Sequence, residues 1–95
     1  MEIKHTQRGF SLVEFEDRYG EKCSLQKSSL ATEDAIWFGI DKPKLTVFEN
    51  ENKGKYIVTD MPSNFDVSAR MHLTQDMVKE LLPLLQKFAE TGELE

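Results

Sequence analysis

The carboxylates best suited to acid–base chemistry are Glu14, Glu16 and Asp17, which stand close together in the N-terminal half of the chain. Alternate residues of a β-strand share one face, so Glu14 and Glu16 could form the carboxylate pair of a hydrolase. The hairpin expected here places Lys22 opposite Glu16, however, and an outward charged strand face is the commoner cause of such a pattern. We therefore expect a solvated face and assign no catalytic residue.

The two histidines, His5 and His72, do not form a metal-binding pattern. A structural zinc site needs several ligands that converge at characteristic spacing, and the chain offers a single cysteine, Cys23. We expect His72 to be a partly buried hydrogen-bonding residue. Neither a metal nor a cofactor is predicted.

Cys23 could act as a nucleophile only beside an activating base or a cation. The expected hairpin register places it among apolar residues instead, which favours packing in the core. A lone cysteine also excludes an intramolecular disulfide and fits a reducing cytoplasm. We expect a non-enzymatic protein with no evident small-molecule substrate.

Length and charge narrow the class of protein further. A chain of 95 residues predicts one domain, residues 1–95, of which the polar residues 1–8 are expected to be flexible. The net charge of -5 disfavours nucleic acid as a partner, because binding to phosphates depends on clustered cations. The chain shows no signal-peptide pattern and no apolar run near the ~20 residues of a membrane span, so we expect a cytoplasmic protein.

The element expected to organise the fold is a C-terminal amphipathic helix. Thr74 suits its N-cap, and Gly92 can adopt the left-handed conformation that ends helices. Pro83 costs about 3 kcal/mol inside a straight helix, so we expect one kinked helix rather than two. The apolar residues recur at the spacing of a single helical face: Met77, Val78, Leu81, Leu82, Leu85, Phe88 and Ala89.

The clearest β-hairpin is expected around the turn at residues 17–20. Asp17 suits the first position of a type I turn, and Gly20 suits the left-handed residue that closes it with a bulge. This turn places Asp17 opposite Glu21. The resulting register gathers apolar side chains on one face: Val13, Phe15, Cys23 and Leu25.

Further strands are expected from short apolar or alternating runs: residues 35–40, 45–49, 55–60 and 70–73. Gly39 should mark a bulge or a close backbone approach. The sum is an α+β fold, a mostly antiparallel sheet of about five to six short strands with one C-terminal amphipathic helix packed on one face. That packing would bury Leu81, Leu85 and Phe88.

An apolar interaction surface is expected on the side of the sheet that the helix leaves free. Trp37 and Phe38 are adjacent in a strand and so point to opposite sides, which leaves one of them away from the helix. Phe10 and Leu12 fall on the side opposite the apolar hairpin face. These four residues are our candidate surface for a protein partner or a homodimer, unless a loop at residues 61–68 covers them.

Two blocks of the sequence resemble a group of small, uncharacterised proteins encoded by bacteriophages and prophages. The blocks are SLQKSSLATEDAIWFGID, residues 24–41, and ARMHLTQDMVKELLPLLQKFAETGEL, residues 69–94. Together they cover about half of the chain. The resemblance implies a phage or prophage origin and a bacterial host cytoplasm, and it implies no known activity, so no functional residue is carried over.

Three functions are consistent with these observations. The leading one is a non-enzymatic module that binds a protein partner, or a second copy of itself, through a sheet face or edge. The second is an acidic inhibitor of a host nucleic-acid-binding enzyme, with a continuous surface of Glu14, Glu16, Asp17, Glu49, Glu51 and Asp60. The third is a small nucleic-acid-binding domain that uses Arg70, His72, Lys22 and Lys27.

Overall fold

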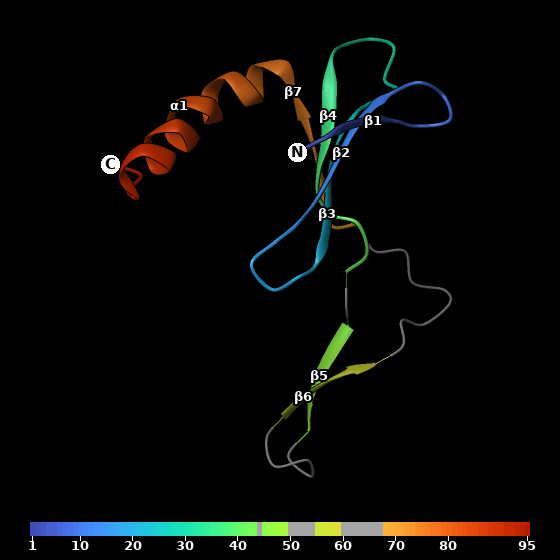
Figure 1. Ribbon diagram of the computed structural model, residues 1–95, viewed down its shortest axis with the longest axis vertical. Coiled ribbons are helices and arrows are strands. Elements are labelled where there is room, and N and C mark those ends of the chain that lie inside the picture. Colours follow the sequence, from blue (N-terminus) through green and yellow to red (C-terminus); the bar gives the residue numbers. More distant parts are fainter. Residues whose placement is uncertain (44, 50–54, 60–67) are drawn as a thin grey trace.

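The computed structural model describes residues 1–43, 45–49, 55–59 and 68–95, and within residues 45–49 and 55–59 only the side chains of Thr46 and Val58 (Figure 1). Along these residues the chain forms seven strands and one helix. They are β1 (Ile3–His5), β2 (Ser11–Glu16), β3 (Lys22–Lys27), β4 (Ala35–Ile40), β5 (Leu45–Glu49), β6 (Lys55–Thr59), β7 (Arg70–Thr74) and α1 (Gln75–Thr91).

The strands form two antiparallel sheets rather than one. The larger has the order β1-β2-β3-β4-β7, and β5 pairs with β6 alone. The β5–β6 hairpin is therefore an insertion between two neighbouring strands of the main sheet. The predicted α+β class is confirmed, with a five-stranded antiparallel sheet and one C-terminal helix.

The first hairpin has the predicted register, in which Val13 pairs with Leu25 and Phe15 pairs with Cys23. Its turn is closed by a hydrogen bond from the amide of Gly20 to the carbonyl of Asp17, at 3.1 Å, and Gly20 has a φ of 81°. The turn residues therefore set the pairing as their chemistry requires.

Alternation along the paired strands gives the main sheet two unlike faces. We call one the apolar face: Ile3, Val13, Phe15, Cys23, Leu25, Ile36, Phe38, Ile40, Met71 and Leu73. We call the other the polar face: Lys4, Leu12, Glu14, Glu16, Lys22, Ser24, Gln26, Trp37, Arg70 and His72. Met71 and Leu73 thus share one face and Arg70 and His72 the other, as predicted.

Residues 1–8 contain a strand where the sequence indicated a flexible segment. β1 pairs with β2, and Ile3 lies opposite Val13. The chain reverses between them because the Thr6 hydroxyl accepts a hydrogen bond from the amide of Phe10, at 3.1 Å, and the Thr6 carbonyl accepts one from Gly9, at 2.9 Å. The polar composition of residues 1–8 does not indicate this turn, which depends on a hydrogen bond to the Thr6 side chain.

Both ends of α1 are capped as predicted. The Thr74 hydroxyl accepts from the amide of Met77 at 3.3 Å, and Gly92 has a φ of 79° while its amide donates to the carbonyl of Phe88 at 2.8 Å. The helix runs through Pro83 as one element.

The helix packs against the sheet through β7 and its own first turn, and its apolar side beyond that turn is open. Leu81, Leu85 and Phe88 are 40%, 54% and 56% exposed, so the expectation that the sheet buries them is wrong. The physical reason is the connection: Thr74 is both the last residue of β7 and the N-cap of α1. No loop is left in which the chain could reverse and lay α1 across its own sheet.

The part of the chain that the structure describes accordingly has few buried apolar residues. Among the described residues the buried apolar ones are Cys23 and Ala35, at 5% and 3% exposure. The Cα radius of gyration is 17.0 Å, against about 12 Å for a compact domain of this length, because α1 and the β5–β6 hairpin extend away from the main sheet (Figure 1).

Gly39 in β4 is the close backbone approach that the sequence suggested. Its φ is 148°, and a Cβ atom added there would lie 2.6 Å from the carbonyl oxygen of Ala69 and 3.0 Å from the Cα of Arg70. Only glycine lets β7 approach β4 at this point.

We predict that Gly39→Ala lowers the free energy of unfolding by about 3 kcal/mol, from the backbone overlap added to the strain of positive φ. Gly9→Ala is the matched control, because Gly9 also has positive φ but nothing lies within 4 Å of an added Cβ. It should cost only about 1 kcal/mol. Urea unfolding would measure both, and equal losses would contradict the overlap.

Candidate functional site

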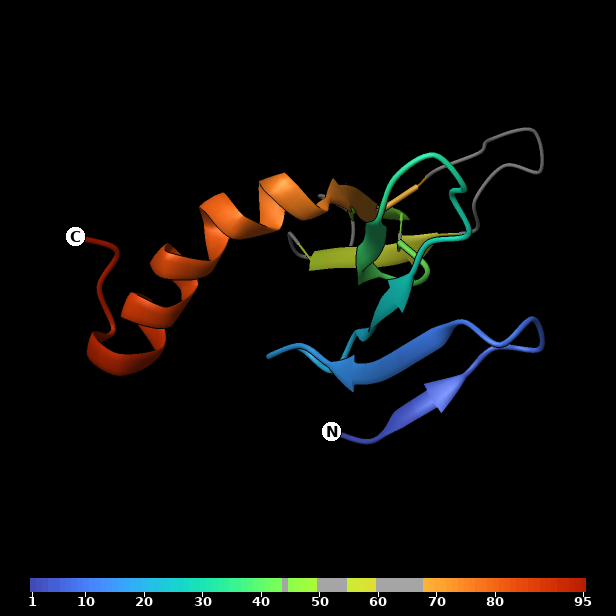
Figure 2. The same cartoon turned by 90° about the horizontal axis from the view of Figure 1, so that it is seen from above.

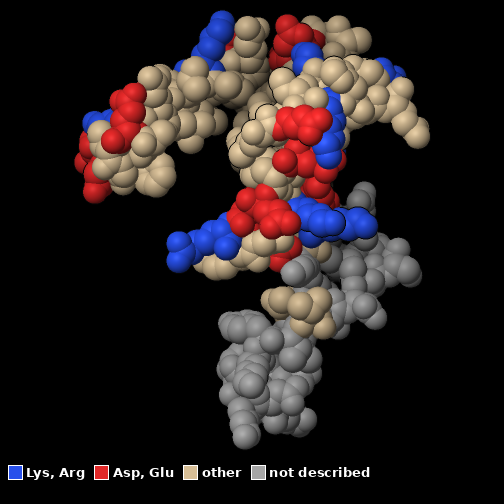
Figure 3. Space-filling view, in the orientation of Figure 1, with Lys and Arg blue, Asp and Glu red and all other residues tan. Residues whose placement is uncertain are grey.

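An unbroken apolar stripe runs along α1. It consists of Met77, Val78, Leu81, Leu82, Leu85 and Phe88, and we call it the α1 stripe. All of these side chains except Val78 are exposed. Figure 3 shows a continuous uncharged surface along α1 between the charged side chains near its two ends. A contiguous exposed patch of this kind on a small protein indicates a contact surface.

The α1 stripe meets the apolar face of the sheet at the start of the helix. A hollow of about 260 Å³ lies there, lined among others by Ile36, Leu73 and Val78. The amide of Gln75 donates to the carbonyl of Asp34 at 3.1 Å, which ties the first turn to the β3–β4 loop. Beyond this turn α1 leads away from the sheet (Figure 2). The exposed stripe and the partly exposed apolar face are therefore joined at one edge.

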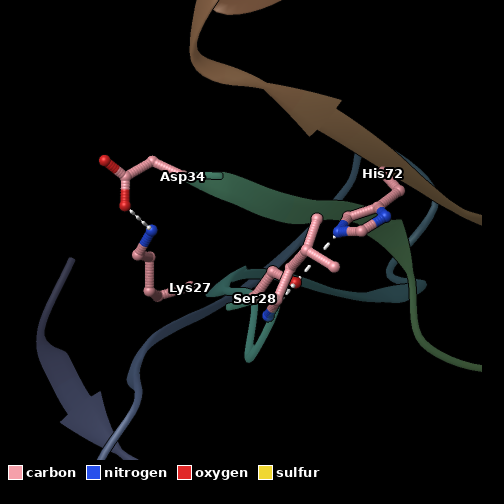
Figure 4. Close-up of polar contacts among 5 residues, drawn as sticks. Lys27, Ser28, Asp34 and His72 are labelled. Carbon is pink, nitrogen blue, oxygen red and sulfur yellow. Dashed lines mark hydrogen bonds and ion pairs between the residues drawn. The ribbon is translucent and has the colours of Figure 1, made fainter. Parts of the chain in front are cut away.

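A single ion pair stands at the rim of this junction. The Lys27 ammonium lies 2.8 Å from the Asp34 carboxylate (Figure 4). This hydrogen bond and the charge of Lys27 lower the pKa of Asp34. The Asp34 side chain is largely in solvent and that of Lys27 partly so, and the pair therefore marks the edge of the apolar area and adds little stability.

The polar face carries an ordered network centred on Arg70. Because Gly39 has no side chain, the Arg70 guanidinium reaches past β4 and donates to Gln26 on β3 at 2.9 Å and to Ser24 at 3.4 Å. The hydroxyl of Ser24, which is buried, donates in turn to the carboxylate of Asp41. On the polar face, the bonds from Arg70 therefore connect β7 to β3 across β4.

Trp37 lies between two cationic or ionisable groups on this face. Its ring stacks on His72 at 4.0 Å with an interplanar angle of 8°, and the Arg70 guanidinium lies 5.5 Å from the ring centre. The His72 ring also forms a 2.9 Å hydrogen bond with the buried hydroxyl of Ser28 (Figure 4). His72 is thus the hydrogen-bonding residue that was predicted, although it is exposed rather than partly buried.

The four residues of the candidate interaction surface do not share one face. Phe38 lies on the apolar face, where its ring makes an edge contact with Phe15 at 6.0 Å. Leu12 and Trp37 lie on the polar face, aligned across Gln26. Phe10 precedes β2, with the Arg8 guanidinium 5.5 Å above its ring. The loop at residues 61–68, which was expected to cover one face, lies outside the described residues up to position 67.

The exposed apolar residues that the sequence reasoning missed are those of the α1 stripe. Their spacing correctly indicated an amphipathic helix, and we assigned them to the core of the same chain. The missing signal was the absence of turn residues between the strand and the helix. Thr74 serves both elements, so only the first turn of the stripe reaches the sheet that the whole stripe was expected to cover.

The four residues proposed for nucleic-acid contact are not gathered into one patch. Lys27 lies on the side of the apolar face and pairs with Asp34. Arg70, His72 and Lys22 lie on the polar face, where Lys22 is opposite Glu16.

The acidic residues proposed for an inhibitory surface stand among cations. Lys4 lies 3.8 Å from Glu14, and Figure 3 shows acidic and basic side chains next to one another on the visible side of the molecule. The side chains of Glu49, Glu51 and Asp60 lie outside the described residues.

Cys23 lies on the apolar face and is buried, as predicted. Burial raises the pKa of its thiol, and the negative charges of Asp17 and Asp41 raise it further. The thiol is therefore kept protonated, the opposite of what a nucleophilic cysteine requires.

Two further observations hold for the part of the chain that the structure describes. No three histidine, cysteine, aspartate or glutamate side chains there are grouped so that they could hold a metal ion. None of its helices combines the length and the apolar character needed to cross a membrane.

No family model matches the chain, and neither curated protein sequences nor solved structures show a significant match to it. The resemblance to small phage and prophage proteins therefore stays a prediction.

We predict that the Cys23 thiol of the folded protein reacts with iodoacetamide only at a pH above that of an ordinary thiol, because its raised pKa delays formation of the thiolate. Unfolding in urea should shift the pH profile down to a midpoint of about 8.5. Alkylation rates followed by mass spectrometry would measure this shift. Coincident profiles for folded and unfolded protein would show that the thiol is not perturbed.

Proposed function

We propose that this chain is a non-enzymatic protein-binding module whose contact surface is the α1 stripe together with the apolar face. One observation carries the proposal: an uncharged helical stripe is exposed, and few apolar side chains among the described residues are buried. Leucine and phenylalanine that are exposed to water raise the free energy of the molecule, and a surface that covers them lowers it.

The size of the effect supports binding. Complete burial of a leucine or phenylalanine contributes about 1.5–3 kcal/mol, so covering a side chain that is half exposed contributes about 1 kcal/mol. Five such residues on α1 would give about 5 kcal/mol, before any contribution from the apolar face. That is enough to offset a substantial part of the cost of association, about 4–15 kcal/mol.

The setting we propose is the cytoplasm of a bacterial host, where the chain would act as a phage- or prophage-encoded accessory protein. The two sequence blocks noted above support the origin, and an unpaired cysteine fits a reducing compartment. A protonated thiol and carboxylates paired with lysines support a role without catalysis.

We predict that a photo-crosslinking benzoylphenylalanine in place of Leu85 yields covalent protein adducts in cells, since Leu85 lies in the α1 stripe. The same group in place of Lys87, which is exposed about 200° around the helix from Leu85, is the matched control and should yield few. Mass spectrometry of the purified chain would identify adducts. Equal yields at both positions, or none at Leu85, would refute the proposed surface.

A further inference from the structure

We infer that the occupant of this surface is a second copy of the chain: α1 of each copy lies across the apolar face of the other, in a reciprocal exchange about a two-fold axis. The inference rests on the proposed function and names its partner. It concerns which molecule covers the α1 stripe, and in what arrangement.

The first argument is that one chain carries both halves of a two-layer structure and cannot bring them together. The apolar face needs a helix over it, and the α1 stripe needs an apolar surface beneath it. Thr74 joins β7 to α1 without a loop, and the bond from Gln75 to the Asp34 carbonyl fixes the direction in which the helix leaves. A short hinge that prevents closure within one chain is the usual setting for exchange of an element between copies.

The second argument is the match in size. α1 has 17 residues and is therefore about 25 Å long. Five strands about 4.8 Å apart form a face about 20 Å wide, and strands of six residues are about 20 Å long. One helix thus spans the face from edge to edge.

The area is also that of a stable dimer. The apolar face and the α1 stripe together offer each copy on the order of 700 Å² to bury, as projected from these dimensions. A standard stable interface buries about 800 Å² per partner. The two copies each carry a net charge of -5, but the α1 stripe itself carries none, so their contact brings no like charges together at its centre.

The third argument concerns the junction. The hollow beside Ile36, Leu73 and Val78 is apolar on its sheet side and has the Lys27–Asp34 pair at its rim. It lies where the stripe and the face of one chain meet. The helix of a second copy that lies on the face would run into this hollow and contact the first copy's stripe as well, so sheet and helix would both be covered by one element.

The first test is the mass of the full chain by size-exclusion chromatography with light scattering. We expect twice the 11.0 kDa of one chain. Leu85→Glu should weaken the dimer by about 100-fold or more, because symmetry places the new charge in both contacts. Lys87→Glu also makes the surface of α1 more negative, but it lies about 200° around the helix from Leu85 and should leave the dimer intact.

The second test distinguishes reciprocal exchange from other dimers. Met71→Glu places a charge on the apolar face at a residue that is 54% exposed, so the fold should tolerate it. Leu85→Glu and Met71→Glu should each be monomeric alone. Mixed together they should form a heterodimer, because the intact helix of one then meets the intact face of the other.

Any other result of these two tests overturns the inferred reciprocal dimer. A Met71→Glu protein that still dimerises alone would indicate contact between helices only, and a dimeric Leu85→Glu protein would indicate contact between sheets only. If circular dichroism shows that Met71→Glu is unfolded, Ile3→Glu replaces it, since Ile3 is 64% exposed on the same face. A monomeric wild type that crosslinks another protein through position 85 would overturn the dimer and leave the proposed function standing.

Discussion

The arrangement of this molecule depends on the junction at Thr74, where β7 ends and α1 begins without a residue between them. The hydroxyl of Thr74 caps the helix, so the helix must start here. The backbone of the same residue is paired with Ala35, so the strand must continue to here. These two requirements together fix the direction of α1, which packs against the sheet through its first turn and leads away from it beyond that turn. The exposure of the α1 stripe follows from this one constraint.

The two faces of the main sheet are stabilised by different interactions. On the polar face, hydrogen bonds from Arg70 to Gln26 and Ser24 cross three strands, and Trp37 packs between His72 and Arg70. These polar and stacked contacts are complete within one chain and leave that face suited to water. The apolar face has no such substitute, because its residues lower their free energy only by excluding water. Under the proposed function, a partner would cover the apolar side of the sheet and leave the polar side in water.

Local chemistry explains which parts of the fold could be predicted from the sequence. The first hairpin was predictable to the residue, because Asp17 and Gly20 define the turn and the turn defines the register. The ends of α1 were predictable for the same reason, through Thr74 and Gly92. The separation of β5 and β6 from the main sheet was not predictable, since alternation indicates a strand but does not indicate which strand it pairs with.

The position of α1 shows the limit of pattern reasoning more clearly. An amphipathic stripe indicates that one side of a helix is covered from water. It does not indicate whether the covering surface belongs to the same chain. That information lies in the segment that connects strand and helix. A connection of two or more turn residues lets the chain reverse direction, and a connection without turn residues does not. For Phe38 and Leu85 the pattern is equally apolar, yet one is half-buried in its own sheet and the other is open. The difference between a half-buried and an exposed apolar residue is here set by the geometry of a single residue, Thr74, rather than by the hydrophobicity of either side chain.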